Sequence, residues 1–498
     1  MIIDLAAWRA AQTPDRPALR WRGEWTSYAE LDRRAGKLAA RLHAEGVRRG
    51  DRVAILALNH IAHLDLVLAA PKLGFVYTPF NYRLSGAEQK DIAQAIEPTL
   101  VMHDRANELK AEAIGGRLLP LARYADWLKK RAAPVPAPEL TGDDIHMILF
   151  TGGSTGVPKG ALIPYRQVHQ NAVNTVSTWG LTADDCAIQA TPAFHAALNV
   201  LTTPLLHVGG RVDWMETFDA GDYLDHAASA GATVLFMVPT MFQALADHPA
   251  FADADLSRVR FAITGGAPCP PALREKFAAR NIRFRLGFGM TECGVNCFSI
   301  STEEAEQHPD SVGHPMPGLR AVIRQADGKE VARGEVGELT LSGPVVFSGY
   351  YRRPAETAEA LRDGWLWTGD LARQDRDGLF YICGRRKEMY ISGGENVYPA
   401  EVEAALSQCR GVVECAVVGI PHPRWGETGL AAVTLKRGAK QSADNLRTEL
   451  KSRLAGYKLP SEFLFLKALP KTGAGKINKP GIRALYDEQG ATSAAGGH

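Results

Sequence analysis

The stretch "FTGGSTGVPKGA", Phe150 to Ala161, follows an apolar run and combines glycines, hydroxyl side chains and a lysine. Glycines let a backbone fold closely around an anion, and hydroxyl and ammonium groups donate to phosphate oxygens. The usual nucleotide loop has glycine, lysine and a hydroxyl residue in succession at a helix start. Here Pro158 precedes Lys159 and Gly160 follows it. We expect a phosphate loop of another kind, although a plain glycine turn has a similar composition.

Short apolar runs and helical patterns alternate around this stretch. The segment 27–46, "SYAELDRRAGKLAARLHAEG", has apolar residues at three- and four-residue spacing, which predicts an amphipathic helix. The apolar runs are "RVAILAL", "VYTPF", "TLVMHD", "HMILF", "CAIQA", "TVLFMV" and "FAITGG". Such runs between helices are typical of parallel strands buried on both faces. We therefore predict an α/β fold that binds its ligands at the carboxyl ends of the strands.

The length of 498 residues exceeds one ordinary core, so two or more domains are expected. After Asp310 the sequence becomes β-rich, as in "GEVGELTLSG" and "GLFYICG", which predicts a small β-rich subdomain. Beyond Lys387, the helical patterns "PAEVEAALSQC" and "SADNLRTELKSRLAG" alternate with strand patterns, and Ser442 is a suitable helix cap. We predict a large N-terminal domain (1–386), a small mobile α+β domain (387–486) and a flexible tail (487–498).

Composition and charge exclude several classes of function. Lysine and arginine total 57 against 55 acidic residues, a net charge of +2, which gives no general reason to expect a nucleic acid or an anionic membrane as partner. Asp4, Arg9 and Asp15 interrupt the first segment, so it is neither a signal peptide nor a membrane span, and no later segment reaches about 18 apolar residues. The seven scattered cysteines indicate reduced thiols and a cytoplasmic location.

The motif "FGMTECG", Phe288 to Gly294, has a chemistry suited to a nucleotide. The ring of Phe288 can stack on adenine, and the hydroxyl of Thr291 can donate to a phosphate oxygen. Glu292 is a hard oxygen ligand of the kind that nucleotide-bound Mg²⁺ takes. The alternative is a strand-end turn with an exposed glutamate.

Six motifs together resemble, in their order along the chain, those of the acyl-adenylate-forming enzymes. This superfamily contains acyl-CoA synthetases, peptide-synthetase adenylation domains and firefly luciferase. The matching stretches are "TGGSTGVPKG", "GGAPCP", "FGMTECG", "WLWTGDLA", "GRRKEMYISGGENVYPAEVE" and "PKTGAGKINK". Gly152 stands where the family more often has serine, and Phe288 where it more often has tyrosine. The resemblance covers the chain from about Trp25 to Lys479.

The resemblance implies a role for each matched residue. The implied phosphate-binding residues are Thr151, Gly153, Ser154, Thr155, Gly156, Lys159 and Thr291. The implied nucleotide-binding residues are Gly265, Gly266, Ala267, Pro268, Gly287, Phe288, Gly289, Met290, Asp370 and Arg385, the last two at the ribose. The remaining implied roles are metal binding for Glu292, the hinge for Lys387, the CoA tunnel for Gly393 and Gly394, and catalysis for Lys476 and His195.

The function that the resemblance implies is that of an AMP-forming acid–thiol ligase with ATP, Mg²⁺ and CoA. A carboxylic acid is adenylated with release of pyrophosphate, and the acyl group then passes to CoA with release of AMP. The apolar stretch 236–242, "FMVPTMF", suits an aliphatic or aromatic acid, of which we favour a fatty acid. The alternatives are a benzoate or cinnamate-type acid, a carrier-protein thiol as acceptor, and a non-catalytic acyl-adenylate-binding protein. A homodimer is a further expectation.

Overall fold

The computed structural model describes residues 3–151, 158–265, 269–472 and 476–495. The chain forms two compact units, one of Met1–Ala321 with Thr340–Trp367 and one of Val322–Leu339 with Thr368–His498. The divisions fall inside β16 (Arg320–Arg324), β17 (Gly337–Ser342) and β19 (Trp365–Gln374). Compactness thus groups residues 368–386 with the C-terminal part of the chain. The domain boundary predicted at 386/387 stays a prediction.

Within the described residues, unit 1 contains a six-stranded sheet in the order β6-β5-β3-β4-β7-β8. Its strands are β3 (Arg52–Leu56), β4 (Val76–Pro79), β5 (Leu100–His103), β6 (Leu118–Pro120), β7 (Ile145–Thr151) and β8 (Lys159–Pro164). Strands β3 to β7 run parallel to one another, and β8 pairs antiparallel with β7. Helices of this region are α2 (Tyr28–Ala44), α3 (Ile61–Leu73), α4 (Gly86–Ile96), α5 (Glu108–Ile114), α6 (Tyr124–Lys129) and α7 (Tyr165–Trp179).

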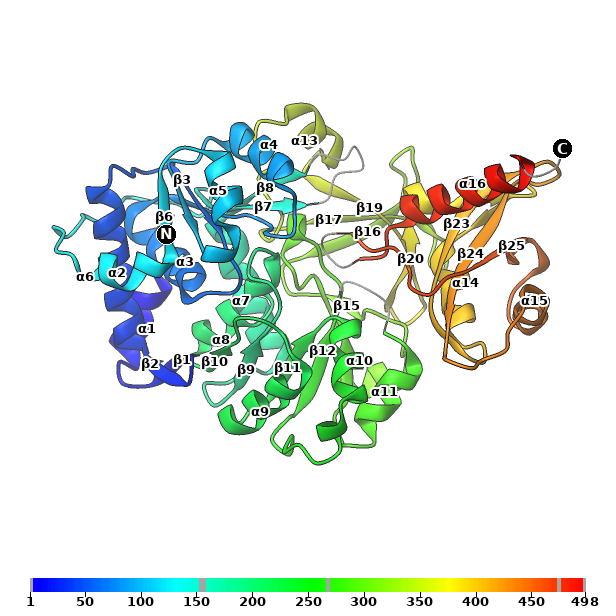
Figure 1. Cartoon of the computed structure of the whole chain (residues 1–498), viewed down its shortest axis with the longest axis horizontal. Coiled ribbons are helices and arrows are strands. Elements are labelled where there is room, and N and C mark those ends of the chain that lie inside the picture. Colours follow the sequence, from blue (N-terminus) through cyan, green and yellow to red (C-terminus); the bar gives the residue numbers. More distant parts are fainter. Residues whose placement is uncertain (1–2, 152–157, 266–268, 473–475, 496–498) are drawn as a thin grey trace. The chain divides into compact units, whose positions relative to one another are not determined.

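Unit 1 also contains a seven-stranded sheet, in the order β13-β12-β11-β9-β10-β1-β2 among the residues described. Its strands are β1 (Pro17–Trp21), β2 (Glu24–Ser27), β9 (Cys186–Gln189), β10 (Arg211–Trp214), β11 (Val234–Met237), β12 (Phe261–Thr264) and β13 (Phe284–Leu286). Figure 1 shows its helices in green, namely α8 (Thr202–Val208), α9 (Ala220–Ala230), α10 (Pro239–Asp247) and α11 (Pro271–Ala278). Phe242, Phe277 and Phe284 pack edge to face in the core between α10, α11 and β13.

Local sequence signals account for much of this fold. The helix predicted at 27–46 forms as α2, with the Ser27 hydroxyl accepting from the N–H of Glu30 as its N-cap. The apolar runs form β3, β4, β5, β7, β9, β11 and β12, which confirms the predicted α/β class. Their parallel pairing places the ends of neighbouring strands, and the loops that follow them, at one edge of each sheet.

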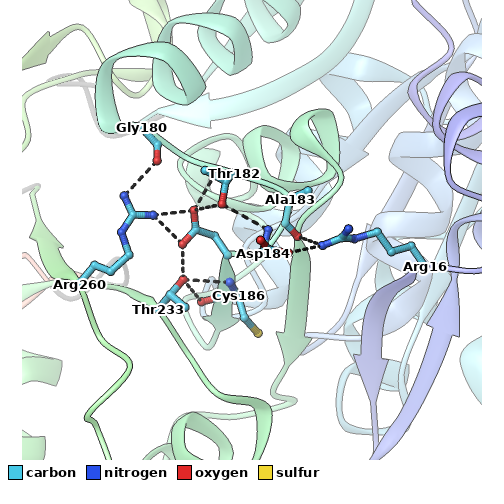
Figure 2. Close-up of polar contacts among 9 residues, drawn as sticks. Arg16, Gly180, Thr182, Ala183, Asp184, Cys186, Thr233 and Arg260 are labelled. Atoms are coloured by element: carbon cyan, nitrogen blue, oxygen red, sulfur yellow. Dashed lines mark hydrogen bonds and ion pairs between the residues drawn. The ribbon is translucent and has the colours of Figure 1, made fainter.

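A buried ionic cluster joins the end of α7 to β9 and β11. Asp185, 2% exposed, accepts hydrogen bonds from the N–H of Thr182 (2.7 Å) and the hydroxyl of Thr233 (2.6 Å). Arg260 Nη1 lies 2.8 and 2.7 Å from its two carboxylate oxygens, and Nη2 donates to Gly180 O. Figure 2 shows Arg260 extending toward Thr182 and Gly180, with Thr233 beneath. The cluster fixes the residues that precede β9 and β11 relative to the C-terminal end of α7.

Unit 2 is built around a sheet in the order β22-β21-β24-β23, with β25 paired to β24. Unit 2 also contains parts of β16, β17 and β19, and β20 (Phe380–Arg385) pairs with β19. Its further elements are β21 (Tyr390–Ser392), β22 (Glu395–Val397), α14 (Pro399–Ser407), β23 (Val412–His422), β24 (Gly426–Leu435), α15 (Ala443–Lys451), β25 (Glu462–Phe465) and α16 (Lys479–Ala495). Successive residues of β23 face opposite sides. Val417 joins a core with Val402 and Leu446, whereas Val418 joins one with Ile482.

Two expectations for this region have clear outcomes. Ser442 caps α15 through the N–H of Asn445, as predicted. Helix α16 continues to Ala495, beyond the start of the tail expected at 487.

All seven cysteines are described and none forms a disulfide. No helix in the described ranges is long and apolar enough to cross a membrane. The dimer stays a prediction.

The remaining elements of unit 1 are short. They are α1 (Leu5–Gln12), β14 (Phe298–Ser299), α12 (Thr302–Gln307), β15 (His314–Pro315), α13 (Pro354–Ala360) and β18 (Leu361–Arg362).

We expect Arg260→Met to lower the free energy of unfolding by about 2 kcal/mol, because the buried Asp185 carboxylate loses a charged donor. Arg22→Met is the matched control, since the Arg22–Glu216 pair is largely exposed and should contribute less than about 1 kcal/mol. Urea titration followed by far-UV circular dichroism measures both. Equal losses in the two variants would contradict a structural role for the cluster.

Candidate active site

The two ends of the stretch 150–161 lie on the paired strands of a β-hairpin. Strand β7 ends at Thr151 and β8 begins at Lys159, and these two residues are partners in the antiparallel ladder. Thr151 Oγ1 donates to Lys159 O at 3.5 Å. The predicted phosphate ligands between them, Gly153, Ser154, Thr155 and Gly156, lie outside the described residues. Lys159 therefore opens the strand β8, and α7 begins after this strand, at Tyr165.

Glycine at position 160 has a packing reason. A Cβ built on Gly160 would lie 2.8 Å from Ile148 Cγ2, on the paired strand. Its absence lets β7 and β8 pair closely where Lys159 emerges.

Glu292 is a buried carboxylate rather than the exposed turn residue of the alternative. It lies in the short 3₁₀ helix Thr291–Cys293 and is 7% exposed. The hydroxyl of Tyr350 donates to Glu292 Oε1 at 2.9 Å, and the N–H of Phe347 donates to Glu292 O at 2.8 Å. Gln167 Nε2 on α7 donates to Thr291 O at 2.9 Å. Side chain and backbone of the motif are thus fixed from two directions.

Tyr350 was not predicted as a site residue. Besides its bond to Glu292, its ring lies 5.2 Å from Lys159 Nζ, within cation–π range. A bridge between Ala161 and Tyr350 holds it beside the hairpin. Tyr350 therefore joins Lys159, predicted to bind phosphate, to the carboxylate of Glu292, predicted to bind the metal. The only local signal was its place in "FSGYY", an aromatic pair after a glycine.

The donor set fits Mg²⁺ delivered with a nucleotide. Among the described residues no group of three or more His, Cys, Asp or Glu could hold a metal ion. A single anchored carboxylate at Glu292 suits Mg²⁺, which usually binds one or two carboxylates and takes its other ligands from phosphates and water.

The segments predicted to bind the nucleotide begin at adjacent strand ends. Gly265 follows β12 and Gly287 follows β13, with the Gly287 N–H donating to Thr264 O at 2.9 Å. A Cβ on Gly265 would lie 3.1 Å from Gly287 O, so the two backbones approach closely. A Cβ on Gly289 would overlap the carbonyl of Val295. Gly266, Ala267 and Pro268 lie outside the described ranges.

Phe288 and Met290 lie in the segment between β13 and Glu292, and both are half-buried. The Phe288 ring packs edge to face on Phe298, with centroids 5.7 Å apart. The Phe288 carbonyl accepts from the N–H groups of Cys297 and Phe298. The backbone of Phe288 is thereby fixed next to Gly287.

His195 is half-buried in the segment after β9. Its ring lies 4.2 Å from that of Phe194, which in turn packs edge to face on Tyr82. Asn59, which sequence reasoning missed, holds this segment from the end of the other sheet. Its Oδ1 accepts from the N–H of Ala193 at 2.7 Å, and its Nδ2 donates to Thr191 O at 3.1 Å.

Unit 2 brings together the two residues expected at the ribose. Asp370 in β19 and Arg385 in β20 are ladder partners, and Arg385 Nε lies 2.7 Å from Asp370 Oδ1. Asp370 is 4% exposed. Glu338, also missed, accepts from the N–H of Gly369 at 3.0 Å. Arg385 therefore holds the carboxylate of Asp370, and Glu338 holds the backbone of the residue before it.

The other predicted residues of unit 2 lie on exposed turns. Lys387 is in the 3₁₀ helix Arg386–Glu388, which follows β20 directly. Gly393 and Gly394 form the turn between β21 and β22 with φ of 62° and 91°, values that favour glycine. Lys476 is exposed beside a bridge between Lys471 and Ile477.

Comparison with known proteins identifies the family. Residues 6–351 match the model of the AMP-binding enzymes, and residues 401–476 match that of the AMP-binding enzyme C-terminal domain. The chain belongs to the AMP-binding enzyme family. The resemblance to acyl-adenylate-forming enzymes is thereby confirmed.

Relatives of this AMP-binding enzyme cover nearly its whole length. A feruloyl-CoA synthase of Amycolatopsis is 41% identical over 488 residues, 97% of this chain and 99% of the relative. The long-chain-fatty-acid–CoA ligase FadD13 of Mycobacterium tuberculosis is 34% identical over 472 residues, 92% of this chain and 93% of the relative. The crystal structure of ATP-bound MatB from Rhodopseudomonas palustris matches with a TM-score of 0.90 and 32% identity, over 98% and 99% of the two chains. The expected enzyme class, AMP-forming acid–thiol ligase, is confirmed.

We expect Tyr350→Phe to raise by about tenfold the Mg²⁺ concentration that gives half-maximal ATP turnover, because Glu292 loses the donor that orients it. A magnesium titration of steady-state turnover at saturating ATP measures the shift. Tyr351→Phe is the control, since the neighbouring tyrosine makes no bond to Glu292. An unchanged magnesium requirement in Tyr350→Phe would remove Glu292 or its tyrosine from the metal site.

Proposed function

We propose that this AMP-binding enzyme is a CoA ligase for an aromatic carboxylic acid of the hydroxycinnamate type. The observation that carries the proposal is the 41% identity, over 97% of the chain, to a feruloyl-CoA synthase. The relative named for long-chain fatty acids is 34% identical over a shorter part of the chain. A fatty acid, which sequence analysis favoured, is the second candidate.

The enzyme uses ATP, Mg²⁺ and CoA in two steps. The substrate carboxylate attacks the α-phosphorus of ATP, and pyrophosphate leaves. The CoA thiol then attacks the acyl carbon, and AMP leaves. The first step brings two anions together, so positive charge has to be fixed where they meet.

Each fixed group has a place in the first step. Lys159 and Thr151, which are ladder partners where β7 ends and β8 begins, would hold the β- and γ-phosphates. Asp370 would accept from the ribose hydroxyls. Lys476 would bridge the carboxylate and the α-phosphate oxygens. Glu292 would hold Mg²⁺, which would supply further screening of the phosphate charge.

The second step depends on the groups of unit 2. We propose that the C-terminal domain turns about Lys387, which carries Lys476 away and brings the exposed Gly393–Gly394 turn to the CoA arm. Both glycines present no side chain, so a thin pantetheine chain can pass beside them. The acceptor is CoA rather than a carrier-protein thiol, in line with the relatives named above.

Aromatic side chains stand next to the residue proposed to contact the acid. Phe194 and Tyr82 pack edge to face with centroids 5.1 Å apart, and Phe194 adjoins His195. Aromatic faces and edges pack well on a substrate ring. His195 would orient the carboxylate of such an acid.

We expect ferulate to give a kcat/KM for pyrophosphate release at least about tenfold above that of palmitate or benzoate, because a pocket shaped for one acid loses contacts to the others. The assay couples pyrophosphate release to a colour reaction, with and without CoA. A preference for palmitate would establish the fatty-acid candidate instead. If none of the acids in the panel gives pyrophosphate release, the non-catalytic adenylate-binding alternative would be favoured.

A further inference from the structure

The loop that carries Lys476 is fixed at its base by backbone bonds. The N–H of Thr472 donates to Lys476 O at 2.7 Å, and the N–H of Asn478 donates to Pro470 O at 2.8 Å. Lys471 and Ile477 face each other in an antiparallel bridge. The base has two legs, residues 470–472 and residues 476–478. The contacts that hold these two legs therefore determine the position of Lys476.

A lysine holds each leg through ion pairs. Lys471 makes one such pair and Lys479 makes two. Lys471 Nζ lies 2.8 Å from Glu414 Oε1 on β23, and both side chains are about one-third exposed. Lys479, the first residue of α16, lies 2.7 Å from Glu388 Oε2 and 2.9 Å from Glu403 Oε1. The Lys479 side chain is only 19% exposed. Burial lowers the pKa of Lys479, but the two carboxylates outweigh it and the pKa is raised overall.

The partners of Lys479 belong to different elements. Glu403 lies on α14, where its carboxylate also accepts from the N–H of Val417 on β23 at 2.8 Å. Glu388 ends the 3₁₀ helix that contains Lys387. On the other side of Lys387, Arg386 pairs with Glu338 at 3.3 Å. Both neighbours of the expected hinge residue are therefore held by ion pairs within unit 2, and one of those pairs leads to the base of the Lys476 loop.

We infer that Lys479 is a positioning residue that ties the base of the Lys476 loop to the 3₁₀ helix 386–388, called the hinge helix here. Lys476 and the hinge helix then move as one body. The inference rests on the proposed function, in which Lys476 acts during adenylation and leaves before thiolation. Without the Lys479 ammonium, Glu388 and Glu403 repel each other across a half-buried site. The loop base then shifts relative to the hinge helix, and a shift of about 1 Å in a catalytic group can slow a reaction about a hundredfold.

The test compares Lys479→Gln with Lys479→Arg and with Lys471→Gln, which removes the equivalent ion pair from the other leg. Two half-reactions are measured separately, ferulate-dependent pyrophosphate release and CoA thiolation of synthetic feruloyl-AMP. Lys479→Gln should lower kcat for adenylation by about 10- to 100-fold, with KM for ATP and thiolation within about twofold of wild type. Lys479→Arg should restore most of the rate, and Lys471→Gln should lose less than about threefold.

Several outcomes would overturn the inference. Equal loss in both half-reactions together with a lower melting temperature would make Lys479 a general stabilising residue. If Lys471→Gln lowers kcat for adenylation as much as Lys479→Gln does, the ion pair to the hinge helix has no specific role. A wild-type rate in Lys479→Gln would show that the tie is unnecessary.

A readout without turnover separates this inference from the proposed function. Hydrogen exchange of the peptide covering 470–479 should be faster in Lys479→Gln than in wild type, because the bonds at Thr472 and Asn478 open more often. The peptide should exchange at the wild-type rate in Lys479→Arg. If wild type releases no pyrophosphate with any acid, the proposed function fails while exchange still tests the tie. Unchanged exchange in Lys479→Gln would contradict the tie whatever the activity.

Discussion

Two nearly buried carboxylates, Glu292 and Asp370, set the conditions that the rest of each unit has to meet. They are 7% and 4% exposed, and burying a carboxylate is unfavourable unless donors replace the lost water. In unit 1 the hydroxyl of Tyr350 supplies a donor to Glu292. In unit 2 the guanidinium of Arg385 supplies one to Asp370. The first pair joins segments 58 positions apart. The second joins ladder partners on the consecutive strands β19 and β20, so it depends only on the pairing of these two strands.

The segments predicted to bind the nucleotide lie where strands end. Gly265 and Gly287 follow neighbouring parallel strands, and the motif with Glu292 begins immediately after them. The hairpin of β7 and β8 belongs to the other sheet of unit 1, and Asn59, in the segment after β3 of that sheet, holds the segment before His195. In unit 2, the ion pairs of Arg386 and Glu388 fix the short helix around Lys387 from both sides. A rotation at Lys387 would then carry a stiff segment, with the Lys476 loop attached to it.

The strands and the long helices could be predicted because their signals are local. The helix 27–46, the cap at Ser442 and the apolar runs each depend on spacing within a few residues. The roles of the site residues came from motifs in a known order, and the family match supports that resemblance. Contacts between distant positions could not be predicted. Asn59 and Ala193 are 134 positions apart, and neither stretch indicates that the two meet.

The central claim is that the acid is activated as an acyl-adenylate. The most direct test is a turnover of ferulate labelled with ¹⁸O in both carboxylate oxygens, with ATP and CoA, followed by mass spectrometry of the products. Attack of the carboxylate on the α-phosphorus predicts one ¹⁸O in the phosphate of AMP, none in pyrophosphate, and the other ¹⁸O in the thioester carbonyl. Formation of ADP with ¹⁸O in orthophosphate, or AMP without label, would contradict the account.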